Sequence, residues 1–452
     1  SLQQKWAYLL RIVRQKFPFW FKHMCPSITT RELTNITDLL RGKFQEIVQA
    51  TVEDEHWEQA CLPIKSCGCG LGNPANTISS AFVAHIDENI ETLKKVFSNA
   101  PFLAFFDVSV PLNEDFLDLN PSIQRSIDEY RTRKNDSLEA ANRFPDASQE
   151  KDISDLTKKK KLQSYYHSLL AERDILQFQT RIHRAHNNRD KARIFSVEGS
   201  FAGAWLHSIP KKYEQQMQNE EFKRALWLRL GIEFPDHPLR CTCTGHPTID
   251  KGSVDHLIIC KQFNAAIIDR HDTLGREFKS LCQQAGLQWT DPNRSQLRNV
   301  AHDNGITTDG YIRGLYAKPC FVDFTIAHPT GQDYLRKGSA THKHHALEYL
   351  EGLKKDKFNA RCNLAGGSFI PLAFETYGAT STRVDKFIKD VVTRAAEINH
   401  IPYSVLLNYW KKRLSVSLQT GNTRILSLSY RRLFNYGGGN LDRDITTERI
   451  LE

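Results

Sequence analysis

The sequence predicts an α+β protein of several domains, in which a mostly helical N-terminal half precedes a small mixed sheet. A chain of 452 residues is too long for one ordinary hydrophobic core. Apolar residues recur at three- and four-residue spacing through the first hundred residues, which is typical of amphipathic helices. Apolar strand patterns lie near 311–316, 320–327 and 368–376, with helical patterns at 342–359 and 381–434.

Composition indicates a globular chain with a preference for polyanions. Hydrophobic residues make up 40% and charged residues 25%, and the net charge is +9. There is neither a run of about 18 apolar residues nor a charged and then apolar leader, so no membrane span or signal peptide is expected. The chain starts at Ser1 and contains only Met24 and Met217, so we expect it to be the C-terminal piece of a longer protein.

Residues 1–112 are predicted to form a helical region. Helical patterns cover 6–13, 36–48 and 77–98, and a glycine- and proline-rich stretch at 62–74 predicts a tight connection between the last two. This connection contains cysteines, which without a secretion signal are expected to be reduced. A second zinc site would need a fourth ligand, so we interpret these cysteines as small residues of a turn. The residues concerned are Cys61, Cys67 and Cys69, with His56 or His85 as the alternative fourth ligand.

Residues 113–157 are polar, charged and poor in aromatic side chains, which predicts a variable linker. Residues 158–239 follow as a basic helical connector, with a long amphipathic helix expected over 162–195. Its basic side chains indicate either an ordinary solvated helix face or a face that contacts phosphates. The candidate nucleic-acid-binding residues are Lys158, Lys159, Lys160, Lys161, Arg173, Arg181, Arg184, Arg189, Lys191 and Arg193, with Arg270 further along the chain.

Residues 240–262 have the ligand spacing of a zinc knuckle. Cys241 and Cys243 are followed, after twelve residues, by His256 and then by Cys260. Three thiolates and one imidazole suit a closed tetrahedral site, so we expect structural Zn²⁺. His246 could compete as a ligand, and the alternative interpretation is a pair of buried thiols beside an unrelated histidine.

Residues 263–380 contain two aspartates in apolar surroundings. Asp309 enters a predicted hairpin and Asp323 lies inside the predicted strand at 320–327, before a lysine-bearing helix. Two carboxylates on adjacent strands can share Mg²⁺ with a phosphodiester, and a nearby lysine can orient the attacking water. This is the logic of PD-(D/E)xK nucleases, although Thr325 occupies their usual lysine position. The alternative is a turn aspartate and a structural ion pair. The nearby His342, His344 and His345 are interpreted as solvent-exposed.

In this order the motifs resemble the C-terminal region of non-LTR retroelement reverse transcriptases that carry a restriction-like endonuclease. Thr308 stands where that family has the proline of its PD motif, and no Tyr-x-Asp-Asp polymerase signature occurs. The matching segments cover most of the chain. They are 62–74, 192–210, 222–231, the zinc knuckle, Arg270-His271, 308–310, 322–325, Lys354 with Lys357, 369–376 and 413–422.

The resemblance implies a thumb-like region at 1–112, a PD-(D/E)xK-like restriction endonuclease domain at 263–380 and a helical tail at 381–452. It implies a Mg²⁺-dependent, DNA-nicking enzyme in the nucleus, with target DNA, element RNA and an upstream polymerase portion as partners. The implied catalytic residues are Asp309 and Asp323 as magnesium ligands, Lys357 or Lys354 to position water, and Glu375 or His271 as auxiliary ligand or proton handler. The alternatives are an inactive zinc-containing DNA- or RNA-binding module, a fragment of a decayed element, and a scaffold that uses zinc only for folding.

Overall fold

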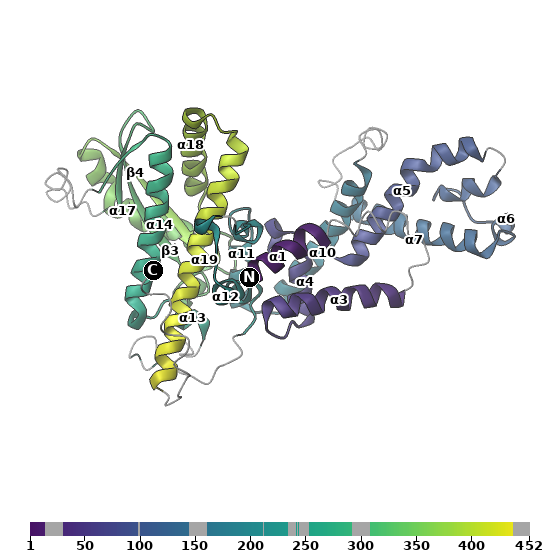
Figure 1. Cartoon of the computed structure of the whole chain (residues 1–452), viewed down its shortest axis with the longest axis horizontal. Helices are drawn as coiled ribbons and strands as arrows, with labels where there is room; N and C mark the ends of the chain where they lie inside the picture. Colours follow the sequence, from purple (N-terminus) through teal and green to yellow (C-terminus); the bar gives the residue numbers. More distant parts are fainter. Residues whose placement is uncertain are drawn as a thin grey trace. The chain divides into compact units, whose positions relative to one another are not determined.

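The computed structural model describes residues 1–13, 30–97, 100–143, 161–210, 212–233, 241, 243, 253–291 and 308–436. The chain divides into two compact units, Leu2–Asn187 and Asn188–Glu452 (Figure 1). Helices predominate among the described residues, whose strands form one mixed four-stranded sheet. The prediction of a mostly helical chain with a small mixed sheet is therefore confirmed.

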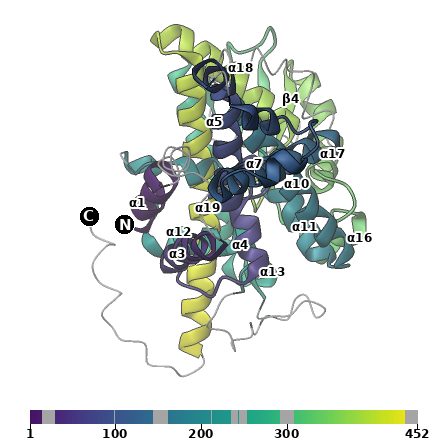
Figure 2. The same ribbon diagram turned by 90° about the vertical axis from the view of Figure 1, so that its right-hand side faces the viewer.

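Helices are the only regular secondary structure among the described residues of the N-terminal unit (Figure 2). Its core lies among α5, α7 and α10, where Phe82, Tyr130 and Leu169 are buried together. The elements are α1 (Leu2–Tyr8), a π-helical turn η1 (Leu9–Val13), α3 (Thr30–Val48), α4 (Asp54–Cys61), η2 (Ile64–Ser66), α5 (Pro74–Val96), η3 (Pro101–Phe106), α6 (Glu114–Leu117), α7 (Pro121–Arg143) and α10 (Leu162–Arg184).

A carboxylate that is largely but not fully buried links the three core helices of this unit. Asp87 of α5 accepts hydrogen bonds from the hydroxyls of Tyr130 (2.6 Å) and Tyr166 (2.5 Å), and it pairs with Lys134. Burial and the Asp87 charge raise the pKa of both tyrosines well above the ordinary value, so both hydroxyls remain donors. One acid thereby satisfies polar groups from α7 and α10 together.

The predicted linker at 113–157 is wrong for its described part, because α6 and α7 occupy most of residues 114–143. Ile127 and Ala140 of α7 are fully buried although the segment is polar overall. A few apolar residues are enough to pack a helix against a core when they recur on one face of that helix. The average composition of the segment does not reveal such a pattern. The rest of the predicted linker, 144–157, lies outside the described residues.

The C-terminal unit contains the sheet, in the order β1-β2-β3-β4. β1, β2 and β3 pair antiparallel, whereas β3 and β4 are parallel and are joined through α17. The elements are α11 (Asn188–Val197), η4 (Ala204–His207), η5 (Tyr213–Gln215), α12 (Asn219–Leu230), α13 (Val254–Leu257), η6 (Lys261–Phe263), α14 (Asn264–Gln284), β1 (Gln288–Thr290), β2 (Gly310–Arg313), β3 (Cys320–Ala327), α16 (Gln332–Lys337), α17 (His345–Leu364), β4 (Ser368–Glu375), α18 (Thr382–Asn399) and α19 (Tyr403–Tyr436).

Helices cover both faces of β3, which explains its nearly continuous apolar sequence. Val322 and Phe324 point to the face that packs on α14, α18 and α19. Phe321 points to the other face, where it meets Phe358 of α17. Since side chains alternate along a strand, Asp323 faces α17 as well.

Two predicted boundaries in this part of the chain are wrong. The helix expected at 162–195 is two helices, α10 and α11, separated at 185–187 where His186 has φ 51°. The division between the two units, after Asn187, therefore falls inside the predicted connector. The predicted tail is not peripheral either, because Val391 of α18 and Leu414 of α19 belong to the same core as Val322.

A glycine allows α19 to approach α14 closely. A Cβ atom built at Gly421 would lie 2.5 Å from Cγ and 2.9 Å from Cβ of Arg270. Arg270 is itself buried, and its Nη1 donates a 2.8 Å hydrogen bond to Asn422 Oδ1. Gly421 thus leaves space for the buried Arg270, and Asn422 accepts its hydrogen bond.

We predict that Gly421→Ala lowers the free energy of unfolding by about 1–3 kcal/mol, because the added methyl group overpacks this contact. Urea denaturation of the whole chain measures the change. Gly352→Ala is the matched control, since Gly352 is also helical and a Cβ there meets nothing within 4 Å. The control should be neutral or slightly stabilising. Equal effects of the two substitutions would contradict the packing explanation.

Candidate functional site

The predicted zinc ligands come together in the C-terminal unit. The candidate ligand atoms of Cys241, Cys243, His256 and Cys260 all lie within 4.8 Å of one another. The sulfur atoms of Cys241 and Cys260 are 3.6 Å apart, and Cys243 Sγ is 3.5 Å from His256 Nε2. Two sulfur ligands of one tetrahedral zinc ion are about 3.8 Å apart, so this cluster could hold a metal such as zinc.

The chemistry of these side chains also suits a metal. Burial raises the pKa of the Cys260 thiol to about 12, so the thiol is neutral until a cation replaces its proton. The Ser253 side chain caps α13 by accepting from the backbone N–H of His256, which fixes the position of that ligand. The possible competitor His246 lies outside the described residues.

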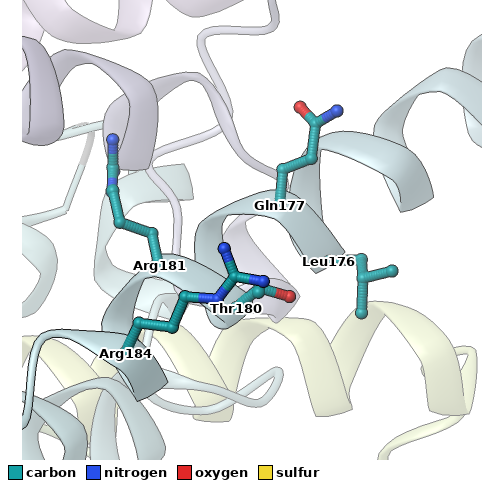
Figure 3. A pocket seen from close by; sticks show the side chains of 5 residues that line it. All are labelled: Leu176, Gln177, Thr180, Arg181 and Arg184. Atoms are coloured by element: carbon teal, nitrogen blue, oxygen red, sulfur yellow. The ribbon is translucent and has the colours of Figure 1, made fainter.

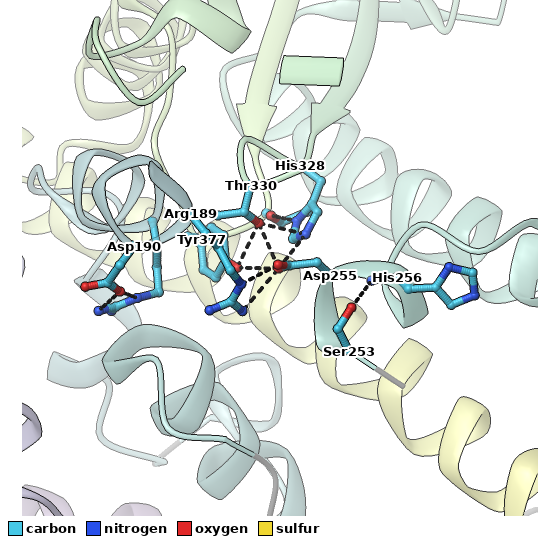
Figure 4. A network of polar contacts seen from close by, with 10 residues as sticks. Arg189, Asp190, Ser253, Asp255, His256, His328, Thr330 and Tyr377 are labelled. Atoms are coloured by element: carbon cyan, nitrogen blue, oxygen red, sulfur yellow. Dashed lines mark hydrogen bonds and ion pairs between the residues drawn. The ribbon is translucent and has the colours of Figure 1, made fainter. Parts of the chain in front are cut away.

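A buried polar network begins one residue before the candidate metal ligand His256 (Figure 4). Asp255 is 6% exposed, and its Oδ1 lies within hydrogen-bond distance of three groups. These are His328 Nε2 (3.1 Å), Thr330 Oγ1 (2.8 Å) and Tyr377 OH (3.2 Å). Arg189 of α11 forms an ion pair with the same carboxylate. Burial opposes ionisation, but His328 and Arg189 hold the pKa of Asp255 well below its usual range.

This network fastens the cysteine–histidine cluster to the sheet. His328 and Thr330 follow the end of β3, Tyr377 follows the end of β4, and Arg189 reaches in from α11. Sequence reasoning missed His328, Thr330 and Tyr377 and assigned Arg189 to nucleic-acid binding, because these residues come from separate segments with no regular spacing. The signal in the sequence that could have pointed to this network is Asp255, an acid directly before the candidate ligand His256.

The two predicted magnesium ligands lie close together in the sheet. The backbone N–H of Asp309 donates to Val322 O (3.0 Å), which places Asp309 directly before β2 and beside β3. The Asp309 carboxylate accepts a 2.7 Å hydrogen bond from the N–H of Phe324, the residue after Asp323. The Asp323 side chain is only 5% exposed, whereas that of Asp309 is 29% exposed. One acid is thus buried and the other faces solvent.

Lys354 is the lysine that α17 brings to these acids. Its Nζ is 2.6 Å from Asp323 Oδ2. Burial raises the pKa of Asp323 and the Asp309 charge adds to the rise, while Lys354 opposes it. Lys357, the preferred candidate from sequence, is exposed and lies over the ring of Phe358, 4.6 Å from the ring centre. Of the two lysines, the geometry therefore favours Lys354.

His271 lies beside the same acids. Its Nε2 is 3.3 Å from Asp309 Oδ2 and 3.2 Å from the carbonyl oxygen of Phe324. The hydrogen bond to Asp309 raises the pKa of His271 to about 9, so the ring is protonated at neutral pH. A protonated imidazole has no lone pair for a metal. His271 therefore fits a proton handler better than an auxiliary ligand.

Glu375 is not brought to this site. In the register of β3 with β4, Asp323 is opposite Pro371 and Glu375 is opposite Ala327, which puts the two acids about 13 Å apart along the strands. Glu375 is 3% exposed, and burial raises its pKa to about 7. The proposed auxiliary role for Glu375 is therefore wrong on geometry.

Several predicted nucleic-acid-binding arginines are used inside the protein. Arg193 is buried between Asp190 and the carbonyl oxygen of Arg229, and Arg189 pairs with Asp255. Arg173 contacts Asn76 and Asp174. Burial lowers the pKa of Arg270 to about 10, and this arginine contacts Asn422. An internal partner occupies each guanidinium, so these four are unsuited to phosphate contacts.

Other predicted basic residues remain accessible. Leu176, Gln177, Thr180, Arg181 and Arg184 line a hollow on one face of α10 (Figure 3). Arg181 pairs with Glu58 at 2.5 Å, whereas Arg184 is exposed. Lys161 is exposed and Lys191 is half-buried. Lys158, Lys159 and Lys160 lie outside the described residues.

No second metal group appears among the described residues. The stretch at 62–74 is a tight turn, as predicted, with positive φ at Cys67 (71°), Gly70 and Gly72 (both 77°). His342 is exposed, whereas His344 and His345 are half-buried, so the histidines are less exposed than predicted.

The chain matches no protein-family model, and no curated protein matches it. Within the described residues, no helix combines the length and apolar character needed to cross a membrane. Functional inference therefore rests on the geometry of the two sites.

We predict about one zinc ion per purified chain, and loss of nearly all of it in Cys260→Ser, since three ligands hold zinc much more weakly than four. Elemental analysis after dialysis measures the metal. Cys282→Ala is the matched control, because Cys282 is fully buried but outside the cluster. Zinc retained in Cys260→Ser, or lost equally from the control, would contradict this assignment.

We predict that Glu375→Gln is more stable than the wild type at high pH only. Folding raises the pKa of Glu375 from 4.5 to about 7, so its contribution is fully present below pH 4.5 and is lost as pH rises through 7. The substitution should be nearly neutral at pH 4 and stabilising by about 3 kcal/mol at pH 9. Urea unfolding of both proteins at the two pH values measures this difference. Parallel pH dependence of the two stabilities would refute it.

Proposed function

We propose that the C-terminal unit is a Mg²⁺-dependent endonuclease that nicks DNA, with a restriction-like active site at Asp309, Asp323 and Lys354. The observation that carries the proposal is the 2.6 Å approach of Lys354 Nζ to Asp323 beside a second carboxylate directly before the adjacent strand. In PD-(D/E)xK enzymes the lysine lies on the same strand as the second acid. In this chain Lys354, on helix α17, would supply that positive charge. The resemblance noted above supports the same assignment.

The donor set fits magnesium. Both acids offer carboxylate oxygens, which Mg²⁺ prefers, and the partial exposure of Asp309 leaves room for the waters that the ion retains. Burial disfavours the ionised form of Asp323, and a divalent cation would offset that cost. When bound, Mg²⁺ would polarise the phosphodiester and lower the pKa of a water molecule.

The protein side chains would then divide the remaining work. Asp309 and Asp323 would hold the cation beside β2 and β3, where Asp309 is partly exposed. Lys354 would steady the negative charge that develops on the phosphate, because its ammonium already lies at the carboxylate pair. His271, protonated at neutral pH, would orient Asp309 and could donate a proton near the scissile bond.

In this proposal the chain is the C-terminal part of a retroelement reverse transcriptase. The cysteine–histidine cluster and the accessible Arg184 would bind target DNA or element RNA. The nicked strand would supply the 3′ end that primes copying of that RNA. Nuclear location and an upstream polymerase portion belong to the same proposal.

A second candidate is a nucleic-acid-binding module without catalysis. The Lys354–Asp323 contact supports it too, since a lysine paired with a buried acid can be purely structural. In that case the cluster and the arginines would bind nucleic acid, and no bond would be cleaved.

We predict that the chain nicks supercoiled plasmid DNA only with Mg²⁺, and that Asp309→Asn and Asp323→Asn abolish nicking, because each removes a ligand charge. Lys354→Ala should slow nicking by about 100-fold or more, in the range seen when one charge-stabilising group is lost. Lys357→Ala is the matched control on the same helix and should retain most of the activity.

The measurement is the rate of open-circle formation, with zinc content and thermal unfolding as checks of folding. Nicking that persists in both aspartate variants would overturn the nuclease assignment. Loss in Lys357→Ala but not in Lys354→Ala would reverse the choice of lysine.

A further inference from the structure

A hollow of about 360 Å³ lies between α14 and the N-terminal part of α19 in the C-terminal unit. Its apolar wall includes Ile401 and Val405, and Val405 is 59% exposed. Tyr409 and Trp410 form its aromatic side. The hollow is therefore an accessible apolar surface with two aromatic rings.

Two cations flank these rings. Lys212 Nζ lies 4.9 Å from the ring centre of Tyr409, and the Arg413 guanidinium lies 4.8 Å from that of Trp410. Arg413 is paired with Glu277, so its charge is largely neutralised. Lys212 is exposed and has no carboxylate partner among the described residues. The hollow thus presents one free positive charge beside an aromatic ring.

The aromatic side is held in place before any ligand arrives. Trp410 is 2% exposed, and its Nε1 donates a 2.7 Å hydrogen bond to Gln284 Oε1. Arg413 Nη1 donates a 3.1 Å hydrogen bond to the Tyr409 hydroxyl. A ligand would therefore meet a rigid surface, which lowers the entropic cost of binding.

The charge of α19 favours an anionic ligand. This helix of 34 residues contains no aspartate or glutamate. Its basic residues are Lys411, Lys412, Arg413, Arg424, Arg431 and Arg432. An exclusively positive helix attracts a polyanion. A protein partner bound only through apolar contacts would gain nothing from that charge.

The hollow is separate from the acidic site. Ser280 of α14 lines the hollow and follows His271 by nine residues. At about 100° per residue, nine residues place two side chains on opposite sides of a helix. The hollow and the Asp309–Asp323 pair therefore lie on different faces of α14.

We propose that this hollow binds an unpaired base of a single-stranded nucleic acid, with the base stacked on Tyr409 and the adjoining phosphate at Lys212. A base that displaces the Lys212 ammonium from the ring leaves that ammonium beside the phosphate of the same nucleotide. Stacking on an aromatic ring tolerates any base, and a duplex cannot offer an unpaired one. The proposal rests on the proposed nucleic-acid function but needs no cleavage chemistry.

Fluorescence anisotropy with a labelled oligothymidylate, in buffer without Mg²⁺, tests the proposal on the whole chain. Tyr409→Leu should raise the dissociation constant at least about fivefold, because the stacking surface is lost. Tyr409→Phe keeps the ring and should bind nearly as tightly as the wild type. Lys212→Gln should reduce the salt dependence of log K by about 0.7, the contribution of one phosphate contact on a single strand.

A second lysine–tyrosine pair provides matched controls. Lys337 Nζ lies 3.9 Å from the ring centre of Tyr349 in the same unit, away from the hollow. Lys337→Gln and Tyr349→Leu should therefore leave oligothymidylate affinity unchanged. Thermal unfolding of every variant separates misfolding from lost contacts.

Unchanged affinity in Tyr409→Leu and Lys212→Gln, or equal losses in the controls, would overturn the proposal and leave the hollow for a protein partner. Loss of affinity in Tyr409→Phe equal to that in Tyr409→Leu would also contradict stacking. A chain that binds the oligonucleotide as predicted but never nicks DNA would disprove the nuclease and not this site.

Discussion

The C-terminal unit depends on one buried carboxylate. Asp255 gathers His328, Thr330, Tyr377 and Arg189 around a single charge, and these partners come from the ends of β3 and β4 and from α11. A buried acid is costly unless every lone pair is used, so removing any partner leaves charge unpaired at the centre of the unit. Because Asp255 precedes the candidate metal ligand His256, the same network determines where the cysteine–histidine cluster meets the sheet.

The position of Asp323 in the acidic site depends on a second constraint, the burial of both faces of β3. Its two faces are buried against different helices, so a shift of one residue would turn Asp323 into the α14 face and Phe324 toward α17. The packing of Phe321 against Phe358 holds α17 in the register that puts Lys354 over Asp323. Hydrophobic packing thus positions the charged groups of the candidate site.

Some basic residues of this protein pair with internal groups and others are exposed, and the sequence does not distinguish the two. Arg193 and Arg270 satisfy internal carbonyl, carboxylate or amide groups, while Arg184 and Lys212 remain accessible. Arginine suits buried sites because its planar fork serves several acceptors, whereas lysine at a surface keeps its solvation. Charge alone therefore overestimates the nucleic-acid surface, and the accessible subset is the part that can meet a polyanion.

The sequence by itself determined the helical pattern, the apolar strands near 320–327 and 368–376, and the four candidate zinc ligands, because each depends on spacing along a short stretch of chain. It could not predict α7, the choice of Lys354 over Lys357, or the distance of Glu375 from Asp323. Those features depend on which helix face a few apolar residues bury and on the register between β3 and β4. Contacts between distant segments decide them, and only the tertiary structure specifies such contacts.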